Sequence, residues 1–141
     1  MTRIILEVNH EPAGQPANQI RMTSKGPRLY RKASHPAVSL KRAIQAAWMQ
    51  QRCKVALTGP ISVWIYAWFR RPVAEIRKTK PMPARRHCRK PDADNIAKCV
   101  LDALNKLAWN DDGQVSDLVV SKRVMPGTDP GKITIVIEGE S

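Results

Sequence analysis

The sequence predicts a single α+β domain, spanning residues 1–141, in which two helices pack on one mixed β-sheet. Segments with the two-residue periodicity of strands are interspersed with two segments of helical periodicity, in the order strand, helix, strand, helix, strand, strand. The chain of 141 residues is long enough for one domain with a substantial core. Neither an internal repeat nor a low-complexity linker divides it.

The first half of the chain predicts one strand, one loop and one helix. Residues 3–9 are apolar and β-branched, which favours a strand. Residues 10–33 contain Pro, Gly, Asn and several cations, so we expect a long basic loop. A helix is expected from about Ser34 to Cys53, because apolar residues recur at helical spacing and Pro36 suits its first turn.

The next predicted strand, residues 61–69, is apolar on both faces. We therefore expect both faces to be covered, one by a helix and the other by a partner subunit. The face with Trp64, Tyr66 and Trp68 has an alternative use, because aromatic rings also stack on the bases of single-stranded nucleic acid.

The second half predicts a helix and two strands. Residues 92–107 carry a continuous apolar face at helical spacing. Residues 115–125 and 132–138 have the apolar, β-branched composition of strands. The sequence PGTDPG between these two strands is a turn signal, so we expect them to form a hairpin.

The charge of the chain indicates a polyanionic partner. Its 24 Lys and Arg against 12 Asp and Glu give a formal net charge of +12, and nucleic acid is the commonest polyanion that such a surface binds. A protein of the membrane surface is the competing class, but it requires a basic amphipathic helix or an anchor. The N-terminus does not resemble a signal peptide. Cys53, Cys88 and Cys99 form no CxxC pair, so we expect a reduced, cytoplasmic protein without a zinc site.

Residues 70–91 are the most basic segment, with nine Lys or Arg, four prolines and one acid, Glu75. We expect this loop to be mobile in the free protein and to bind the phosphate backbone, which relieves its charge repulsion. The alternative is a solvated loop without a partner, and His87 is interpreted as one more basic-loop residue. The candidate DNA contacts in it are Arg70, Arg71, Arg77, Lys78, Lys80, Arg85, Arg86, Arg89 and Lys90.

Four of the twelve acidic residues surround the helix predicted at 92–107. Asp92 and Asp94 lie at its start, where aspartates also occur simply as caps and as partners of the helix dipole. Asp111 and Asp112 follow its end. If the next strand runs back beside the helix, three of these carboxylates can meet near the helix N-terminus. Two or three carboxylates and a phosphate oxygen suit Mg²⁺, which can activate water for phosphodiester cleavage.

Lys98 follows Asp94 by one helical turn and precedes Asp102 by another, so the three share one polar face. Beside a metal it can hold the scissile phosphate or stabilise the leaving group. Its alternative role is an intrahelical ion pair with either aspartate.

The sequences DADNIAKCVLDAL, WNDDGQV and SDLVVSK together resemble the RusA-type Holliday junction resolvases. The resemblance covers residues 91–122 closely and implies a small homodimeric endonuclease that resolves four-way junctions in recombination and repair. Such enzymes are often encoded by phages or prophages and depend on Mg²⁺, for which Mn²⁺ is a candidate substitute.

Carried over residue by residue, the resemblance assigns roles within that segment. It implies metal ligation by Asp92, Asp94 and Asp112, catalysis by these three and Lys98, and lesser roles for Asp111 and Asn95. It also implies that Lys122 contacts DNA. The candidate contacts in the 10–33 loop, where the resemblance is loose, are Asn18, Arg21, Lys25 and Arg28.

Two other functions remain open at this stage. In a nucleic-acid-binding protein that does not cut, the aspartates only cap and solvate a helix. A metal-dependent hydrolase of small phosphoesters ranks last, because a charge of +12 exceeds what a small substrate needs. Convergence of Asp92, Asp94 and Asp112 favours the nuclease, and their dispersal favours the binding protein.

Overall fold

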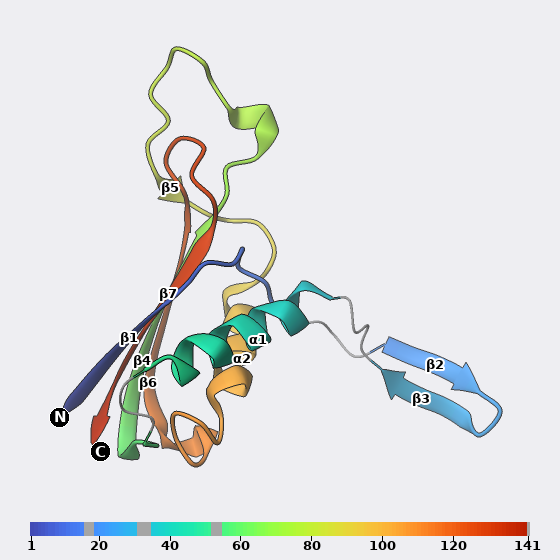
Figure 1. Ribbon diagram of the computed structural model, residues 1–141. Coiled ribbons are helices and arrows are strands. Elements are labelled where there is room, and N and C mark those ends of the chain that lie inside the picture. The colour runs from blue at the N-terminus through green and yellow to red at the C-terminus, as the bar shows by residue number, and fades with distance from the viewer. Residues whose placement is uncertain (16–18, 31–34, 52–54, 141) are drawn as a thin grey trace.

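The computed structural model of the chain describes residues 1–15, 19–30, 35–51 and 55–140. It contains a five-stranded mixed sheet with both α-helices packed on the same face, which confirms the α+β prediction (Figure 1). The sheet strands, in spatial order, are β1 (Thr2–Val8), β7 (Lys132–Glu140), β4 (Thr58–Phe69), β6 (Val115–Val124) and β5 (Arg85–Arg86). The helices are α1 (Pro36–Met49) and α2 (Ala93–Leu104), with short 3₁₀ turns at η1 (Val73–Glu75) and η2 (Asp112–Gln114). Among the described residues, no helix is long and apolar enough to cross a membrane.

The prediction that the last two strands form a hairpin is wrong. β4 lies between them, parallel to β6 and antiparallel to β7. The connection after β6 passes the end of β4, where Met125 N donates a hydrogen bond to Phe69 O at 2.8 Å. β4 is apolar on both faces, so the central position, with a strand on each side, buries it most completely.

The 10–33 segment is also more ordered than the sequence predicts. Its described part contains β2 (Gln19–Thr23) and β3 (Gly26–Tyr30), which pair as an antiparallel hairpin. The hairpin projects away from the sheet and helices (Figure 1). Gly26 allows its tight turn, because φ there is +101°, a conformation that other residues rarely adopt.

The core lies between the sheet and the two helices. Alternate residues of β4, from Ile61 to Phe69, are buried on the helix side. α2 presents Ile96, Val100 and Leu104 to them, each 0% exposed, as its apolar periodicity predicts. The opposite face of the sheet is only partly covered: Ile5, Tyr66 and Val119 are 54%, 37% and 45% exposed. The described part of one chain therefore leaves that face open.

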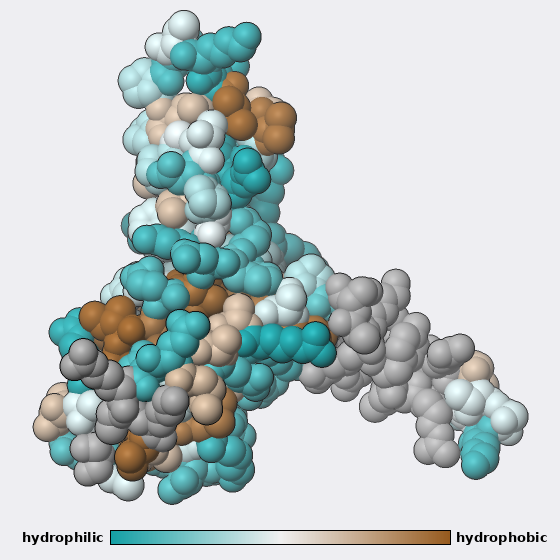
Figure 2. All heavy atoms as spheres, viewed as in Figure 1, coloured by the Kyte–Doolittle hydropathy of each residue, from teal (hydrophilic) through white to brown (hydrophobic). Residues whose placement is uncertain are grey.

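The 70–91 loop extends beyond the end of the sheet, and Figure 2 shows mainly hydrophilic residues on it with one hydrophobic group. It is held to the body at several points. Arg71 is 8% exposed and its guanidinium donates to the carbonyl oxygens of Pro83 and Met125, at 2.6 and 3.3 Å. His87 N donates a hydrogen bond to Lys122 O at 3.1 Å, and within the loop itself Glu75 and Arg85 form an ion pair at 2.6 Å. Part of this basic segment is therefore buried against the body, which its composition does not predict.

Candidate functional site

Asp92 and Asp94 present exposed carboxylates at the start of α2. Asp92 occupies the N-cap position, and its backbone oxygen accepts a hydrogen bond from Ile96 N at 3.1 Å. Its side chain, however, makes no capping hydrogen bond. Asp94 lies in the first turn, where a carboxylate is favoured by the helix dipole. Capping therefore does not consume the Asp92 carboxylate, and both oxygens can bind another group.

Lys98 lies one turn beyond Asp94 and its side chain is exposed. No ion pair joins it to an acid of the described chain within 4.0 Å. Asp102, its other potential partner, instead pairs with Lys41 of α1 at 3.6 Å. The intrahelical ion pair is thus absent, and the Lys98 ammonium remains available beside the Asp94 carboxylate.

Lys122 brings a second cation towards this end of α2. It lies near the end of β6, and its Nζ donates to Arg89 O, three residues before Asp92. The ammonium also lies 6.0 Å from the centroid of the Phe69 ring. Since β6 runs back beside α2, residues from its end reach the loop that leads into the helix.

Asp111 and Asp112 lie at the other end of α2. The Asp111 carboxylate accepts a hydrogen bond from Gly113 N at 3.0 Å and forms a capping box with Gln114, so it stabilises η2. Asp112 Oδ1 accepts from Trp109 Nε1 at 2.8 Å. Trp109 is fully buried, which fixes the position of the Asp112 side chain.

One chain does not bring the three predicted ligands together. α2 has 12 residues, so about 18 Å of helix separates the Asp92 end from the Asp112 end. Within the described ranges, no three His, Cys, Asp or Glu side chains are placed to hold one metal ion. The expectation of convergence in one subunit is wrong because Asp112 precedes the returning strand instead of following it.

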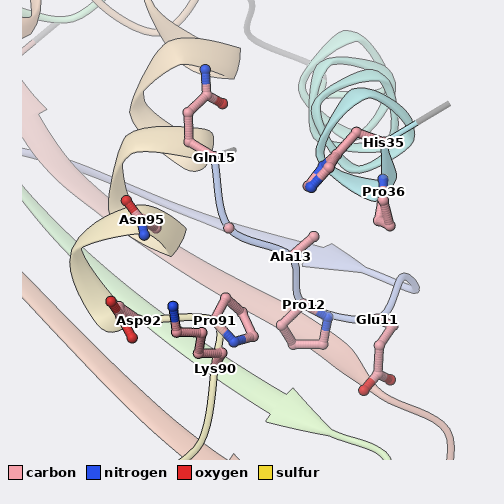
Figure 3. Close-up of a pocket in the computed structure, with 11 residues that line it drawn as sticks. Glu11, Pro12, Ala13, Gln15, His35, Pro36, Lys90, Pro91, Asp92 and Asn95 are labelled. Atoms are coloured by element: carbon pink, nitrogen blue, oxygen red, sulfur yellow. The ribbon is translucent and has the colours of Figure 1, made fainter. Parts of the chain in front are cut away.

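A pocket of about 630 Å³ opens beside Asp92, between the N-terminal ends of α1 and α2 (Figure 3). One wall is the loop of residues 11–15, tied to α2 by a 2.9 Å hydrogen bond from Gln15 N to Asn95 O. Gly14 permits this contact, since a Cβ there would lie 2.8 Å from Pro91 Cβ. Sequence reasoning did not place this loop beside α2, and Gly14 shortly after a strand was the one signal of a close approach.

Two side chains, Glu11 and His87, have pKa values shifted from their ordinary values. Burial raises the pKa of the Glu11 carboxyl, although the hydrogen bond from Arg70 N partly opposes this effect. His87 stacks on Phe69, with ring centroids 3.7 Å apart. Burial lowers the pKa of His87, and the charges of Lys122, Arg85 and Arg89 lower it further. His87 is therefore a packed ring within the loop and is not simply one more cation.

The shifted pKa of His87 predicts a pH dependence of stability. Below the ordinary value of 6.5, the unfolded chain binds a proton at His87 before the folded chain does. The free energy of unfolding should therefore fall as pH decreases from 6.5 through the lower folded pKa. Urea unfolding between about pH 5 and 7 measures this, and His87→Phe, which keeps a ring against Phe69, should reduce the fall. An identical pH profile for the variant would contradict the assignment.

The predicted DNA contacts divide by their exposure. Arg71 is excluded, because its guanidinium is buried and bound to carbonyl oxygens. Arg85 is exposed but is neutralised by Glu75. The side chains of Arg21 and Arg28, and Asn18 entirely, lie outside the described residues. The exposed cations that remain are Lys25, Arg70, Arg77, Lys78, Lys80, Arg86, Arg89 and Lys90.

The fold and this end of α2 define a small α+β protein that presents uncommitted carboxylates within a basic surface, as a protein that processes nucleic acid would. Comparison with known families is specific on this point: the model of the family "Endodeoxyribonuclease RusA" matches residues 10–138. The chain belongs to this family of nucleases.

The chain is also similar to one curated protein of Bacillus subtilis. The chain is 39% identical, over 87 residues, to the uncharacterized protein YqaN of Bacillus subtilis (strain 168). The aligned region covers 58% of this chain and 61% of that protein, so the chain spans less than two thirds of the relative's length.

Proposed function

We propose that the chain is the subunit of a homodimeric, Mg²⁺-dependent endonuclease that resolves four-way (Holliday) DNA junctions in recombination or repair. The observation that carries this proposal is the pair of uncommitted carboxylates, Asp92 and Asp94, beside the unpaired Lys98 in a chain of the RusA family. The exposed cations of the adjoining loop supply the attraction for a DNA backbone.

The donor set suits a hard divalent cation. Asp92 and Asp94 offer carboxylate oxygens, and Mg²⁺ binds one or two carboxylates while keeping several waters; Mn²⁺ is a candidate substitute. When bound, the metal would lower the pKa of an attacking water and stabilise the leaving oxygen. Lys98 would hold the scissile phosphate, and Lys122 would contact the DNA strand beside it. Asn95 lies one residue after Asp94 and would orient neighbouring groups.

A second copy of the chain would supply the third carboxylate. Within the described residues, β5 pairs only with Arg123 and Val124, so residues 115–121 of β6 have a strand partner on one side only. Leu118 and Val119 of this edge point to opposite faces and are 42% and 45% exposed. An exposed apolar edge strand is a template for pairing with another chain.

Antiparallel pairing of two β6 edges follows a two-fold axis, as in a closed dimer. Centred on Leu118, whose backbone faces the free edge as that of Lys122 does, it places Ser116 of one copy opposite Val120 of the other. The Asp112 end of each copy then lies beside the Lys122 end of its partner, which adjoins Asp92. Each of the two resulting sites would contain Asp92 and Asp94 from one copy and Asp112 from the other.

A labelled four-way junction incubated with the protein and Mg²⁺ tests the proposal. We expect paired incisions on opposite strands, no incision without metal, and far slower cutting of a linear duplex of the same sequence. Within one chain, Asp92 and Asp94 do not come together with Asp112. This separation favours one competing function, which is junction binding without cutting. Tight binding with no incision in Mg²⁺ or Mn²⁺ would establish that function instead.

The exposed cations of the 70–91 loop should set the salt dependence of binding. Each phosphate that a cation neutralises contributes about −0.9 to the slope of log K against log salt. Arg86→Ala with Arg89→Ala removes four cations from a dimer and should therefore flatten the slope by up to about 3.6. Arg3→Ala, a matched control near the N-terminus and far from the loop, should leave it unchanged (Figure 1). Equal slopes for the wild type and the double variant would show that the loop does not contact DNA.

A further inference from the structure

The hairpin of β2 and β3 contributes little to the packing of the body. In the described part of the chain, no other helix or strand packs closely against it, and it projects beyond the helices (Figure 1). Met22 of β2 is 74% exposed. A two-stranded hairpin alone in water is only marginally stable. A hairpin that is held away from the core therefore indicates a partner outside the body of this chain.

Hydrogen bonds fix the turn of the hairpin. The Thr23 hydroxyl donates to Gly26 O at 2.7 Å and accepts from Lys25 N at 3.3 Å. Gly26 adopts the positive φ that the turn requires. The two strands are therefore presented as a ribbon with a defined end, and Lys25 is exposed at that end.

The charge of the ribbon indicates an anionic partner. Residues 19–30 contain three Lys or Arg and no acidic residue. The strand register sets Arg21 directly opposite Arg28, and like charges at opposed positions destabilise a hairpin. A polyanion beside both positions removes that repulsion. A second copy of the chain, with its own net charge of +12, is a poorer partner for this surface.

Duplex DNA fits the ribbon in shape as well as in charge. The major groove of B-DNA, about 12 Å wide, admits a two-stranded β-ribbon, whereas the minor groove is only about 6 Å wide. Each strand of the hairpin has five residues, which span about 17 Å. The ribbon is therefore long enough to cross a major groove.

The hairpin is joined to the body near the carboxylates of α2. Gln15 and His35 are the described residues on either side of it, and both line the pocket beside Asp92 (Figure 3). Ser24 in the turn follows Gln15 by nine residues, so it can lie at most about 30 Å from the pocket. At about 3.4 Å for each base pair, this reach corresponds to roughly nine base pairs of duplex.

We propose that the hairpin enters the major groove of one duplex arm of the junction, within about nine base pairs of the phosphate to be cut. The inference rests on the proposed function and assigns part of substrate recognition to intact duplex next to the crossover. Each subunit of a dimer would then hold one arm of the junction beside its own Asp92 and Asp94.

Methylation interference tests which groove the hairpin occupies, because dimethyl sulfate modifies guanine N7 in the major groove and adenine N3 in the minor groove. The readout is binding of a methylated four-way junction without divalent metal. For the wild type, we expect guanine methylation to weaken binding at a cluster of positions within about nine base pairs of the crossover. Arg21→Gln with Arg28→Gln should remove that cluster. It should also weaken binding at least about tenfold, since a dimer loses four cations.

Arg86→Ala with Arg89→Ala is the matched control, because it removes the same number of cations from the 70–91 loop. It should weaken binding to a similar extent while the guanine cluster remains. The Tm of the Arg21→Gln and Arg28→Gln variant should equal that of the wild type, since the body does not pack against the hairpin. A lower Tm would show that the hairpin is part of the packed body, which contradicts a projecting arm.

The possible failures are distinguishable. If the wild type neither binds nor cuts a four-way junction, the proposed function itself fails. If it binds but guanine methylation never interferes, or interferes equally with the hairpin variant, only the major-groove role is overturned. If Met22→Ser converts a dimer into a monomer, the hairpin binds a second copy of the chain, and the major-groove role is overturned as well.

Discussion

Replacing Asp94 with Asn should reduce junction cleavage at least about a hundredfold while junction binding is retained or strengthened. A hundredfold loss corresponds to about 3 kcal/mol of transition-state stabilisation, which is within what a bound metal supplies. Asp94 is exposed and contributes no ion pair to the described fold, so Asn should not disturb packing. Removing one negative charge also lowers repulsion of the DNA backbone. Single-turnover rates at saturating Mg²⁺ and DNA measure the effect.

Asp102→Asn is the matched control for this experiment. Asp102 lies on the same helix, is also exposed, and pairs with Lys41 at 3.6 Å on the surface. Its loss should cost well under 1 kcal/mol of stability and leave cleavage unchanged. Near-wild-type cleavage by Asp94→Asn at saturating metal would show that the Asp94 carboxylate is not a ligand.

The periodicity of the sequence predicted most of the helices and strands but not all of their partners. The apolar face of α2 and the alternation of β4 each follow from local spacing, and both elements lie where that spacing predicts. The prediction that β6 and β7 form a hairpin is wrong, because the sequence PGTDPG indicates that the chain turns but not which strand lies beside β6. Which strand lies beside β6 depends on β4, more than forty residues earlier in the chain.

The candidate site was predictable where it lies on one helix. Asp92, Asp94 and Lys98 are close in sequence, so helical geometry alone brings them to one end and one face of α2. Arg71 could not be separated from the other cations of its loop, because composition does not report which guanidinium finds buried carbonyl oxygens. The wall of the pocket beside Asp92 comes from a loop distant in sequence, and only the packing of that loop against Asn95 reveals the pocket.

Asp112 shows the limit of reasoning within one chain. Its place relative to Asp92 depends on the length of α2 and on the direction of β6, and these put the two carboxylates at opposite ends of the helix. If β6 edges pair between two copies, each site contains carboxylates from both subunits. Two inactive variants could then complement each other in a mixed dimer, which is impossible when each site lies within one chain.

Mixing two inactive variants should restore cleavage. In a heterodimer of Asp94→Asn and Asp112→Asn subunits, one shared site carries both substitutions and the other carries none. Random exchange makes half of the dimers mixed, so about a quarter of the wild-type site concentration should return. Each mixed dimer has one intact site, so the products should be single nicks instead of paired incisions.

The control is a mixture of two variants whose defects lie in the same half of the site, Asp92→Asn and Asp94→Asn. Every shared site in their heterodimer then carries one substitution, so no activity should return. Leu118→Pro in wild-type protein adds an independent check, because the backbone of Leu118, like that of Lys122, faces the edge side of β6. Proline there removes an edge hydrogen bond and should shift the mass towards one subunit of 15.8 kDa. Failure of the first mixture to nick, with subunit exchange verified, would confine the carboxylates to one chain and remove the physical basis for a shared site.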